Sequence, residues 1–244
     1  MDAARKHHNA SQGAGQTAAG LFQQQWTTYR KIVDNNYLFH REAYAALRQC
    51  LQENSRESFS FLDLACGDAA STVEALRGTA VSHYRGVDLS EIALREAERR
   101  VETLGCAFDL QLADFTEVLM QWSGPAEIVW IGLSLHHFLS DQKLALMREI
   151  RRIVGKSGKL MVYENTSLED ETRQGWLARW DRQEPNWPAL TPDEWRAVTD
   201  HVHQNDHPET ARGWFDLGEA AGFQAARILF VSPTSLFRLF EFRG

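Results

Sequence analysis

Apolar segments and amphipathic segments alternate along the middle of this 244-residue chain, and this alternation limits the possible folds more than any other feature. The apolar segments read as strands: SFSFLDLA, SHYRGVDL, CAFDLQLA, AEIVWIGL and GKLMVYEN. Helices are expected between them at residues 70–77, 91–104 and 141–154, with Ser90 and Gly105 bounding the second one. Strands that alternate with helices form parallel sheets with right-handed crossovers. The sequence therefore predicts an α/β fold with a doubly wound, mostly parallel sheet.

Both ends of the chain add to this core. Apolar residues recur at helical spacing over residues 21–52, with a break at 34–36, so residues 21–55 are expected to form an N-terminal helical cap. Residues 168–208 are rich in Trp, Asp, Arg, Pro and His, which predicts a helical insertion after the fifth strand. The segments QAARILFVS and SLFRLFEFR then read as an antiparallel C-terminal pair, giving seven strands in a domain at 56–244. Residues 1–20 are expected to be a disordered leader.

The net charge and the cysteine content limit the binding partners and the cellular location that can be expected. The formal net charge of −7 argues against binding nucleic acid through many phosphate contacts, so no nucleic acid is expected and a small-molecule partner is favoured. No apolar run approaches the ~18 residues of a membrane span, so no membrane is expected either. The three cysteines are widely spaced and form neither a disulfide framework nor a metal knuckle, which favours a cytoplasmic location.

The first predicted strand is followed by small residues and aspartates. The stretch FLDLACGDAAS places Asp63 near the strand end and Gly67 in the turn. Ligands of open parallel sheets bind beyond the carboxyl ends of the strands, where a turn glycine lets the backbone approach them. A nicotinamide site would usually show GxGxxG to hold a pyrophosphate. One glycine and a carboxylate suit a cationic cofactor better.

The next two strands also end in aspartates. Asp88 lies 21 positions after Gly67, where an acidic side chain can accept the hydroxyls of a ribose. Asp114 follows the third strand, where a carboxylate can accept an adenine amino hydrogen, with Phe115 beside the ring. A single such aspartate reads more simply as a helix cap. Three at the ends of consecutive strands favour a ligand site.

Together these motifs resemble the class I S-adenosylmethionine-dependent methyltransferases with a Rossmann-like fold, of the small-molecule type. LDLACGDAA is similar to the first motif of that family, VDLS to its ribose-binding motif, ADF to its adenine segment and IGLSLHHF to its fourth-strand motif, over about residues 59–164. The resemblance implies S-adenosyl-L-methionine as cofactor and S-adenosyl-L-homocysteine as product. It also implies a set of cofactor contacts: Tyr29, Arg30, Asp63, Ala65, Gly67, Asp88, Leu89, Asp114, Phe115 and Leu133. The family commonly has glycine where Ala65 and Ala69 stand, and alanine tolerates only ordinary backbone angles.

The resemblance implies one in-line displacement that moves the methyl group to N, O, S or C. The enzyme aligns donor and acceptor, excludes water and, where required, helps to remove a proton. The candidate bases are His136, His137 and Glu164. Adjacent residues of a helix point about 100° apart, so at most one histidine is expected to face the site. Alternatively, one histidine hydrogen-bonds the backbone, and Glu164 is a helix cap or an arginine partner.

Candidate contacts to the acceptor come from the cap and the insertion. Tyr37, Trp180, Trp187 and His201 fit an aromatic lid that binds an amine or stacks on a planar ring. In the alternative interpretation the tryptophans pack the insertion onto the core, since Trp176 and Trp180 share a helical face at i, i+4. The cap tyrosines then belong to the apolar stripe of their helix. The stretch HVHQNDH resembles a metal cluster, but its first two histidines do not share a face and methyl transfer needs no metal, so no metal is expected.

The leading hypothesis is a small-molecule methyltransferase. An RNA or protein methyltransferase is the nearer alternative, although no Asn-Pro-Pro-Tyr segment follows the fourth strand. A non-catalytic subunit that binds S-adenosylmethionine is an alternative of another class, and transfer of a different group from a modified sulfonium is a third. The aromatic tail SLFRLFEF is a candidate pairing edge for a homodimer.

Overall fold

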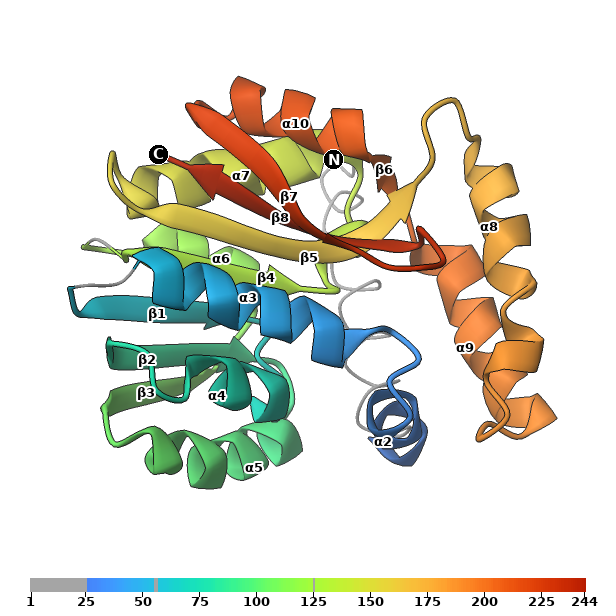
Figure 1. The fold of residues 1–244 in the computed structure, drawn as a ribbon, viewed down its shortest axis with the longest axis horizontal. Coiled ribbons are helices and arrows are strands. Elements are labelled where there is room, and N and C mark those ends of the chain that lie inside the picture. Colours follow the sequence, from blue (N-terminus) through green and yellow to red (C-terminus); the bar gives the residue numbers. More distant parts are fainter. Residues whose placement is uncertain (1–25, 55–56, 125) are drawn as a thin grey trace, which may run out of the picture.

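The computed structural model describes residues 26–54, 57–124 and 126–244. The predicted leader and residues 21–25 and 55 of the predicted cap lie outside these ranges. Within them, a central sheet carries helices on both faces (Figure 1). No helix in these ranges has the length and apolar character needed to cross a bilayer.

The sheet has the strand order β3-β2-β1-β4-β5-β8-β7. Its strands are β1 Phe59–Leu64, β2 Val81–Asp88, β3 Ala107–Leu112, β4 Ile128–Gly132, β5 Lys159–Ser167, β7 Ala225–Val231 and β8 Phe237–Arg243. Strands β1 to β5 pair in parallel, whereas β8 is antiparallel to both β5 and β7. A two-residue strand, β6 (Glu209–Thr210), pairs with the end of β5. The doubly wound, seven-stranded prediction is confirmed, because strands buried on both faces read as nearly continuous apolar runs.

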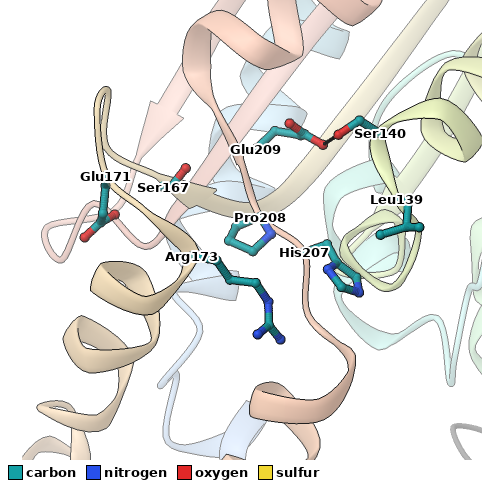
Figure 2. Close-up of a pocket in the computed structure, with 8 residues that line it drawn as sticks. All are labelled: Leu139, Ser140, Ser167, Glu171, Arg173, His207, Pro208 and Glu209. Carbon is teal, nitrogen blue, oxygen red and sulfur yellow. Dashed lines mark hydrogen bonds between the residues drawn. The ribbon is translucent and has the colours of Figure 1, made fainter.

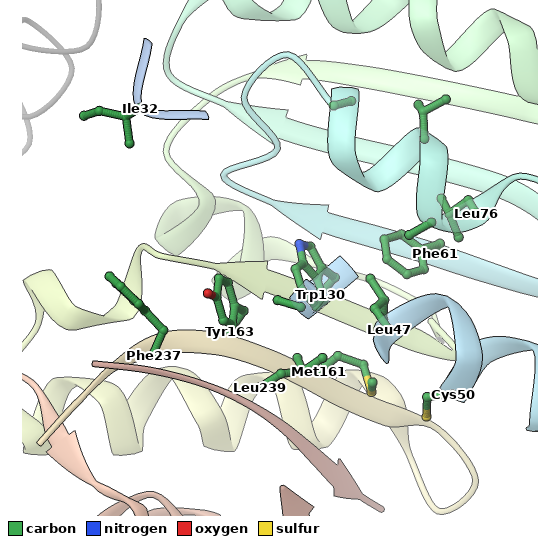
Figure 3. Packing of buried hydrophobic residues seen from close by; sticks show 14 of the residues in the cluster. Ile32, Leu47, Cys50, Phe61, Leu76, Trp130, Met161, Tyr163, Phe237 and Leu239 are labelled. Carbon is green, nitrogen blue, oxygen red and sulfur yellow. The ribbon is translucent and has the colours of Figure 1, made fainter. Parts of the chain in front are cut away.

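Two layers of helices cover the sheet. One face packs against α3 (His40–Asn54), α4 (Ala70–Leu76) and α5 (Glu91–Val101), whose apolar side chains meet Phe61, Trp130 and Tyr163 (Figure 3). The other face packs against α6 (Phe115–Gln121), α7 (Ser140–Val154) and α10 (Ala211–Ala220). This two-sided cover fixes the sheet, so the loops at the carboxyl ends of its strands start from rigid positions.

The predicted limits of the second crossover helix are confirmed at the level of its caps. The Ser90 hydroxyl accepts a hydrogen bond from the Ala93 amide at 3.2 Å, as expected for a helix N-cap. At the other end, α5 continues as a 3₁₀ turn, Glu102–Leu104, and Gly105 follows it with φ of +69°. A left-handed glycine ends the helix without a Cβ clash.

The C-terminal tail does not provide a free edge, contrary to the prediction for SLFRLFEF. Strand β8 lies between β5 and β7, so its backbone groups are paired on both sides. The edge strand here is β7, which exposes Ile228 and Val231. The apolar content of the tail therefore serves the core, where Phe237, Phe240 and Phe242 are buried.

The helical insertion after β5 lies beyond the end of the sheet and faces α2 (Trp26–Asp34) (Figure 1). It consists of α8 (Arg173–Asp181), the 3₁₀ turn Glu184–Asn186 and α9 (Pro192–Asn205). Its four tryptophans are buried against one another and against Phe237. Lys31 of α2 forms an ion pair with Glu194 of α9 at 2.7 Å. The cap and the insertion are thus joined at the carboxyl edge of the sheet.

Candidate functional site

The loop between β1 and α4 is held in left-handed backbone conformations. Gly67 has φ of +54°, and the alanines at 65 and 69 have φ of +56° and +55°. The expectation that these alanines adopt ordinary angles is therefore wrong, and the loop keeps the shape that glycines would give it. A Cβ placed on Gly67 would have no neighbouring atom within 4 Å. The backbone of this turn thus borders open space that a ligand can enter.

Asp88 ties this loop to the end of β2. Its Oδ2 accepts a hydrogen bond from the Gly67 amide and its Oδ1 accepts one from the Ser90 amide, both at 2.8 Å. Burial raises the pKa of Asp88, and the backbone donors partly oppose that shift. The carboxylate therefore lies beside the open space at Gly67.

Asp63 lies beneath the loop and is only 1% exposed. The Tyr84 hydroxyl donates to its Oδ2 at 2.8 Å. Burial raises the pKa of Asp63 to about 7, although hydrogen bonds from Tyr84 and Thr72 act in the opposite direction. In this conformation Asp63 shapes the floor of the loop, and Tyr84, which was not predicted, is its partner.

We call the Gly67 loop with Asp63, Asp68 and Asp88 the acidic edge. Helix α2 brings Tyr29 over this acidic edge. Burial raises the pKa of the Tyr29 hydroxyl, and the negative charges of Asp68, Asp88 and Asp63 raise it further. Arg30, the next residue along α2, is exposed. Three acidic side chains therefore lie near Tyr29, of which Asp68 is paired with Arg100 at 2.7 Å.

Two further predicted contacts border the same edge. Leu89, directly after β2, is 41% exposed. Leu133 follows β4 with φ of +52°, and its amide donates to the Tyr163 carbonyl at 2.7 Å. Both residues lie in loops at the carboxyl ends of strands that flank β1.

Asp114 caps helix α6, as the alternative interpretation of a single aspartate had it. Its Oδ1 accepts hydrogen bonds from the amide and the hydroxyl of Thr116, both at 2.8 Å. Phe115 packs against Phe138 in an edge arrangement with ring centroids 5.9 Å apart. The cap fixes where the loop after β3 turns, while the Phe115 ring remains partly exposed.

Glu164 anchors the loop after β4. Its Oε1 accepts hydrogen bonds from the Ser134 and Leu135 amides at 2.7 and 2.5 Å, and its Oε2 lies 2.6 Å from His136 Nδ1. The side chain is fully buried. Glu164, one of the candidate bases, thus orients His136 and the 3₁₀ turn Leu135–His137.

The two histidines of this turn converge, contrary to the expectation that they point apart. Their ring centroids are 4.1 Å apart. Asp206 Oδ1 lies 3.8 Å from His136 Nε2 and 3.5 Å from His137 Nδ1. The 3₁₀ turn ends directly after His137, so the angle for successive residues of a regular α-helix does not apply.

These groups have shifted pKa values. Burial opposes protonation of His136, but the charges of Asp206 and Glu164 outweigh it and raise the pKa of His136. Burial lowers the pKa of His137 well below its usual range, with His136 adding to the effect. Burial likewise raises the pKa of Asp206 to about 6. We call His136, His137 and Asp206 the histidine corner.

The insertion supplies the outer wall of the histidine corner. His201 of α9 packs edge-on against His137, with ring centroids 5.2 Å apart, and burial lowers its pKa to about 4. Asp206 directly follows α9 and accepts a hydrogen bond from Asn165 Nδ2 at 2.7 Å. Sequence reasoning noted Asp206 only as part of HVHQNDH, because nothing local links it to the loop after β4.

The other predicted acceptor contacts are used for packing. Trp180 and Trp187 are 3% and 5% exposed and belong to the core. Tyr37 stacks on Trp187 with centroids 4.9 Å apart, and its hydroxyl accepts a hydrogen bond from the Ala189 amide at 2.8 Å. These three side chains therefore hold the insertion against the cap, as the alternative interpretation had it.

Two cavities in the described part of the chain have no residue of the Gly67 loop in their linings. One, of about 200 Å³, is next to the segment that follows Asp206 (Figure 2). Its lining residues are Leu139, Ser140, Ser167, Glu171, Arg173, His207, Pro208 and Glu209. The other, of about 460 Å³, lies between β2, β3 and α6. Neither cavity includes a member of the histidine corner.

A comparison with protein families finds a match within the chain. Residues 61–158 match a family described as methyltransferase domain. The match begins in β1 and ends just before β5, so it includes Gly67, Asp88 and the first two members of the histidine corner. A comparison with curated protein sequences finds no match.

Several solved structures share the fold. A magnesium protoporphyrin IX methyltransferase from Synechocystis, solved with bound S-adenosylhomocysteine, is 12% identical over 95% of this chain and 100% of its own, with a TM-score of 0.65. An O-methyltransferase family protein from Burkholderia thailandensis is 15% identical over 87% of this chain, with a TM-score of 0.61. A Nostoc punctiforme protein assigned as an O-methyltransferase is 15% identical over 84% of this chain, with a TM-score of 0.59. The chain spans 57% of the length of each of these last two proteins. The fold is that of the class I methyltransferases.

Proposed function

We propose that this chain, which matches a methyltransferase domain at residues 61–158, moves a methyl group from S-adenosylmethionine to a small-molecule acceptor. The observation that carries the proposal is the acidic edge at Gly67, where open space meets Asp88 and Tyr29. S-adenosylmethionine carries a ribose and positive charges on its sulfonium and amino groups, so it fits such an edge. When bound, it supplies a methyl group that is already activated for displacement.

The residues of this edge have distinct roles in the proposal. The Gly67 backbone borders the cofactor, and Asp88 accepts the ribose hydroxyls, as acidic residues do at this position of related sheets. Phe115 and Leu89 flank the adenine, with Asp114 at its amino group. Tyr29, Leu133 and the Ala65 turn surround the methionine part, with Arg30 at the rim and Asp63 beneath.

The acceptor is proposed to enter between the cap and the insertion, beside the histidine corner. His136 and His137 follow β4, which ends at the same sheet edge as the cofactor loop. Helices α2 and α9, tied by the Lys31–Glu194 ion pair, cover this edge and favour a small acceptor over a polymer. The net charge of −7 also disfavours a nucleic acid.

The proposal also covers a cytoplasmic location and the strand that would support a homodimer. No disulfide joins the three cysteines in the described part of the chain, which is consistent with a reducing cytoplasm. If the protein forms a homodimer, β7 is the strand that supports it, because it exposes Ile228 and Val231 at the edge of the sheet.

Calorimetric titration with S-adenosylmethionine, S-adenosylhomocysteine and NADH tests the cofactor. We expect micromolar binding of the two sulfur nucleosides and none of NADH. Asp88→Ala removes charge-assisted hydrogen bonds worth about 1.5–3 kcal/mol each, so its affinity is expected to fall at least tenfold. Asp109→Ala is the matched control, because Asp109 is an exposed residue of β3 that pairs with His83. Binding of NADH alone, or an Asp88→Ala variant with unchanged affinity, refutes the site.

Release of S-adenosylhomocysteine separates an enzyme from a binding subunit. The protein is incubated with S-adenosylmethionine and pools of small phenols, thiols, amines and carboxylic acids, and the product nucleoside is measured by mass spectrometry. Acceptor-dependent release supports the proposal. Release with RNA or protein alone favours the nearer alternative, and cofactor binding without release from any acceptor favours the non-catalytic one.

A further inference from the structure

We propose that His136 Nε2, His137 Nδ1 and Asp206 Oδ1 bind one divalent transition-metal ion, with Zn²⁺ as the first choice. Among the described residues these donor atoms form a compact trio, all within 4.8 Å of one another. The two distances to Asp206 Oδ1 are 3.5 and 3.8 Å. In a tetrahedral zinc site with bonds of about 2.0–2.1 Å, neighbouring donors lie about 3.3 Å apart. Two of the three donor pairs are therefore within about 0.5 Å of this spacing, and the third pair is separated by no more than 4.8 Å.

Two of the donor atoms lack any other use. In the described part of the chain, Asp206 Oδ1 and His137 Nδ1 are buried polar atoms without a hydrogen-bond partner. The Asp206 side chain is only 2% exposed. Leaving a buried carboxylate oxygen unpaired is costly, and most buried polar groups in proteins are satisfied. A cation placed between the two atoms would satisfy both.

The remaining donor is oriented by a second carboxylate. His136 Nδ1 lies 2.6 Å from Glu164 Oε2, which leaves Nε2 directed toward Asp206. Asp206 Oδ2 accepts from Asn165 Nδ2 at 2.7 Å, which leaves Oδ1 for the ion. Metal-binding histidines almost always donate their other ring N–H to a carboxylate, a carbonyl or water, and ligating carboxylates are themselves hydrogen-bonded.

The composition of the trio indicates the kind of metal. Two imidazoles and one carboxylate suit Zn²⁺ or Fe²⁺, whereas Mg²⁺ and Ca²⁺ prefer oxygen ligands. Three protein ligands leave a coordination position open, as in catalytic zinc sites. The sequence argument against a metal was that His201 and His203 do not share a helical face and that methyl transfer needs no metal; neither of these histidines belongs to the trio. Instead, Asp206 from the same segment joins the histidine pair after β4.

The use of the ion rests on the proposed methyl transfer. A hydroxyl or thiol acceptor bound at the open position loses its proton to solvent more readily, because the ion lowers its pKa. The oxygen or sulfur then forms a bond to the methyl carbon while the sulfonium–carbon bond breaks and S-adenosylhomocysteine leaves. The acceptor class implied by this corner is therefore a metal-binding oxygen or sulfur compound.

Metal content and cobalt spectroscopy test the site without an activity assay. The full-length chain is stripped with a chelator, titrated with Zn²⁺, and its bound zinc is measured by mass spectrometry. Co²⁺ replaces Zn²⁺ in a parallel titration, where intense visible absorption reports four-coordinate geometry. We expect one ion per chain and a four-coordinate cobalt spectrum.

Variants connect the binding to the trio. Asp206→Asn and His137→Ala are each expected to weaken Zn²⁺ binding by more than about tenfold. His203→Ala is the matched control, because His203 is exposed and pairs with Asp181 at 2.8 Å. A His7→Ala/His8→Ala variant removes the only adjacent histidine pair of the sequence besides 136–137 and is expected to bind like the parent. If Asp206→Asn does not fold, His137→Ala carries the test, because its ring is 21% exposed.

The outcomes are separable from those of the cofactor experiment. Absence of stoichiometric zinc, or binding that survives both trio variants or disappears in either control, overturns the metal site whatever the cofactor result. Zinc binding by a chain that fails to bind S-adenosylmethionine supports the site and overturns its role in methyl transfer. An acceptor-dependent reaction that persists in the zinc-free protein also overturns that role.

Discussion

Replacing Gly67 with alanine separates a role in ligand binding from a role in folding. The residue has φ of +54°, and a Cβ there meets no atom of the protein within 4 Å. The left-handed conformation costs an alanine about 1–2 kcal/mol, of which about 0.4–1 kcal/mol is regained because alanine lowers the entropy of the unfolded chain. We therefore expect the free energy of unfolding to fall by about 1 kcal/mol, or roughly 2–4 °C in Tm for a chain of this size.

The effect on cofactor affinity is expected to be larger. The added methyl group occupies the space that we assign to S-adenosylmethionine, and a methyl group forced into a packed contact costs about 1–3 kcal/mol. This corresponds to a loss of affinity of roughly 5- to 150-fold, measured by calorimetry.

Gly105 provides the matched control for this substitution. It has φ of +69°, its Cβ position is equally open, and it ends the α5 crossover rather than bordering the acidic edge. Gly105→Ala should show a similar loss of stability in urea unfolding and an unchanged affinity. Equal affinities in the two variants would refute the assignment of the open space at Gly67 to the cofactor.

Three further predictions concern the rest of the fold. Glu241 is fully buried with three basic partners, which lower its pKa to about 2 although burial acts in the opposite direction. A carboxyl group whose pKa is lowered by folding stabilises the fold at pH values above its pKa in the unfolded chain. The parent should therefore have a higher free energy of unfolding than Glu241→Gln at pH 7, and this difference should shrink between about pH 5 and pH 2. Urea unfolding at pH 7 and pH 3 measures the difference, and a constant difference contradicts the reasoning. Gly218→Ala places a Cβ 2.5 Å from the buried Phe242 ring and should cost about 1–3 kcal/mol in thermal unfolding, whereas an unchanged Tm would mean that the ring moves aside. Lys31→Ala removes the partly exposed ion pair with Glu194, so the free energy of unfolding should change by less than about 1 kcal/mol. The affinity for the cofactor should fall, because this ion pair holds α2 against the insertion. An unchanged affinity would mean that α2 does not contribute to the binding site.

The central sheet could be predicted because its signals are local. The strands at the centre of the sheet are buried on both faces, so β4 reads as the apolar run IVWIG and cannot be confused with a surface helix. Caps such as Ser90 lie within three residues of the atoms that they bond. The backbone conformation of the Gly67 loop was harder to predict. Ala65 and Ala69 have left-handed angles that alanine does not prefer, so the strand and the helix on either side of the loop must impose them.

The histidine corner could not be predicted, because its parts come from distant segments. Asp206 lies 69 positions after His137 in the sequence, and only the packing of the insertion brings its Oδ1 to 3.5 Å from the ring. The same packing buries Trp180 and Trp187, whose aromatic character had suggested contact with an acceptor. Composition indicates that an insertion is helical, but which of its faces turns inward depends on the surface on which it packs.

The two halves of the candidate site differ in what the family match can explain. Apart from Tyr29, the acidic edge lies within residues 61–158, and we propose that it binds the methyl donor. Asp206 of the histidine corner lies outside the matched residues. Helices α2 and α9, which cover this edge of the sheet, also lie outside them. Helix α2 contributes to both halves, through Tyr29 at the acidic edge and through Lys31 to the insertion. Under the proposed function, the identity of the acceptor is therefore best sought through the histidine corner and helices α2 and α9, because Asp206 and both helices lie outside the matched residues.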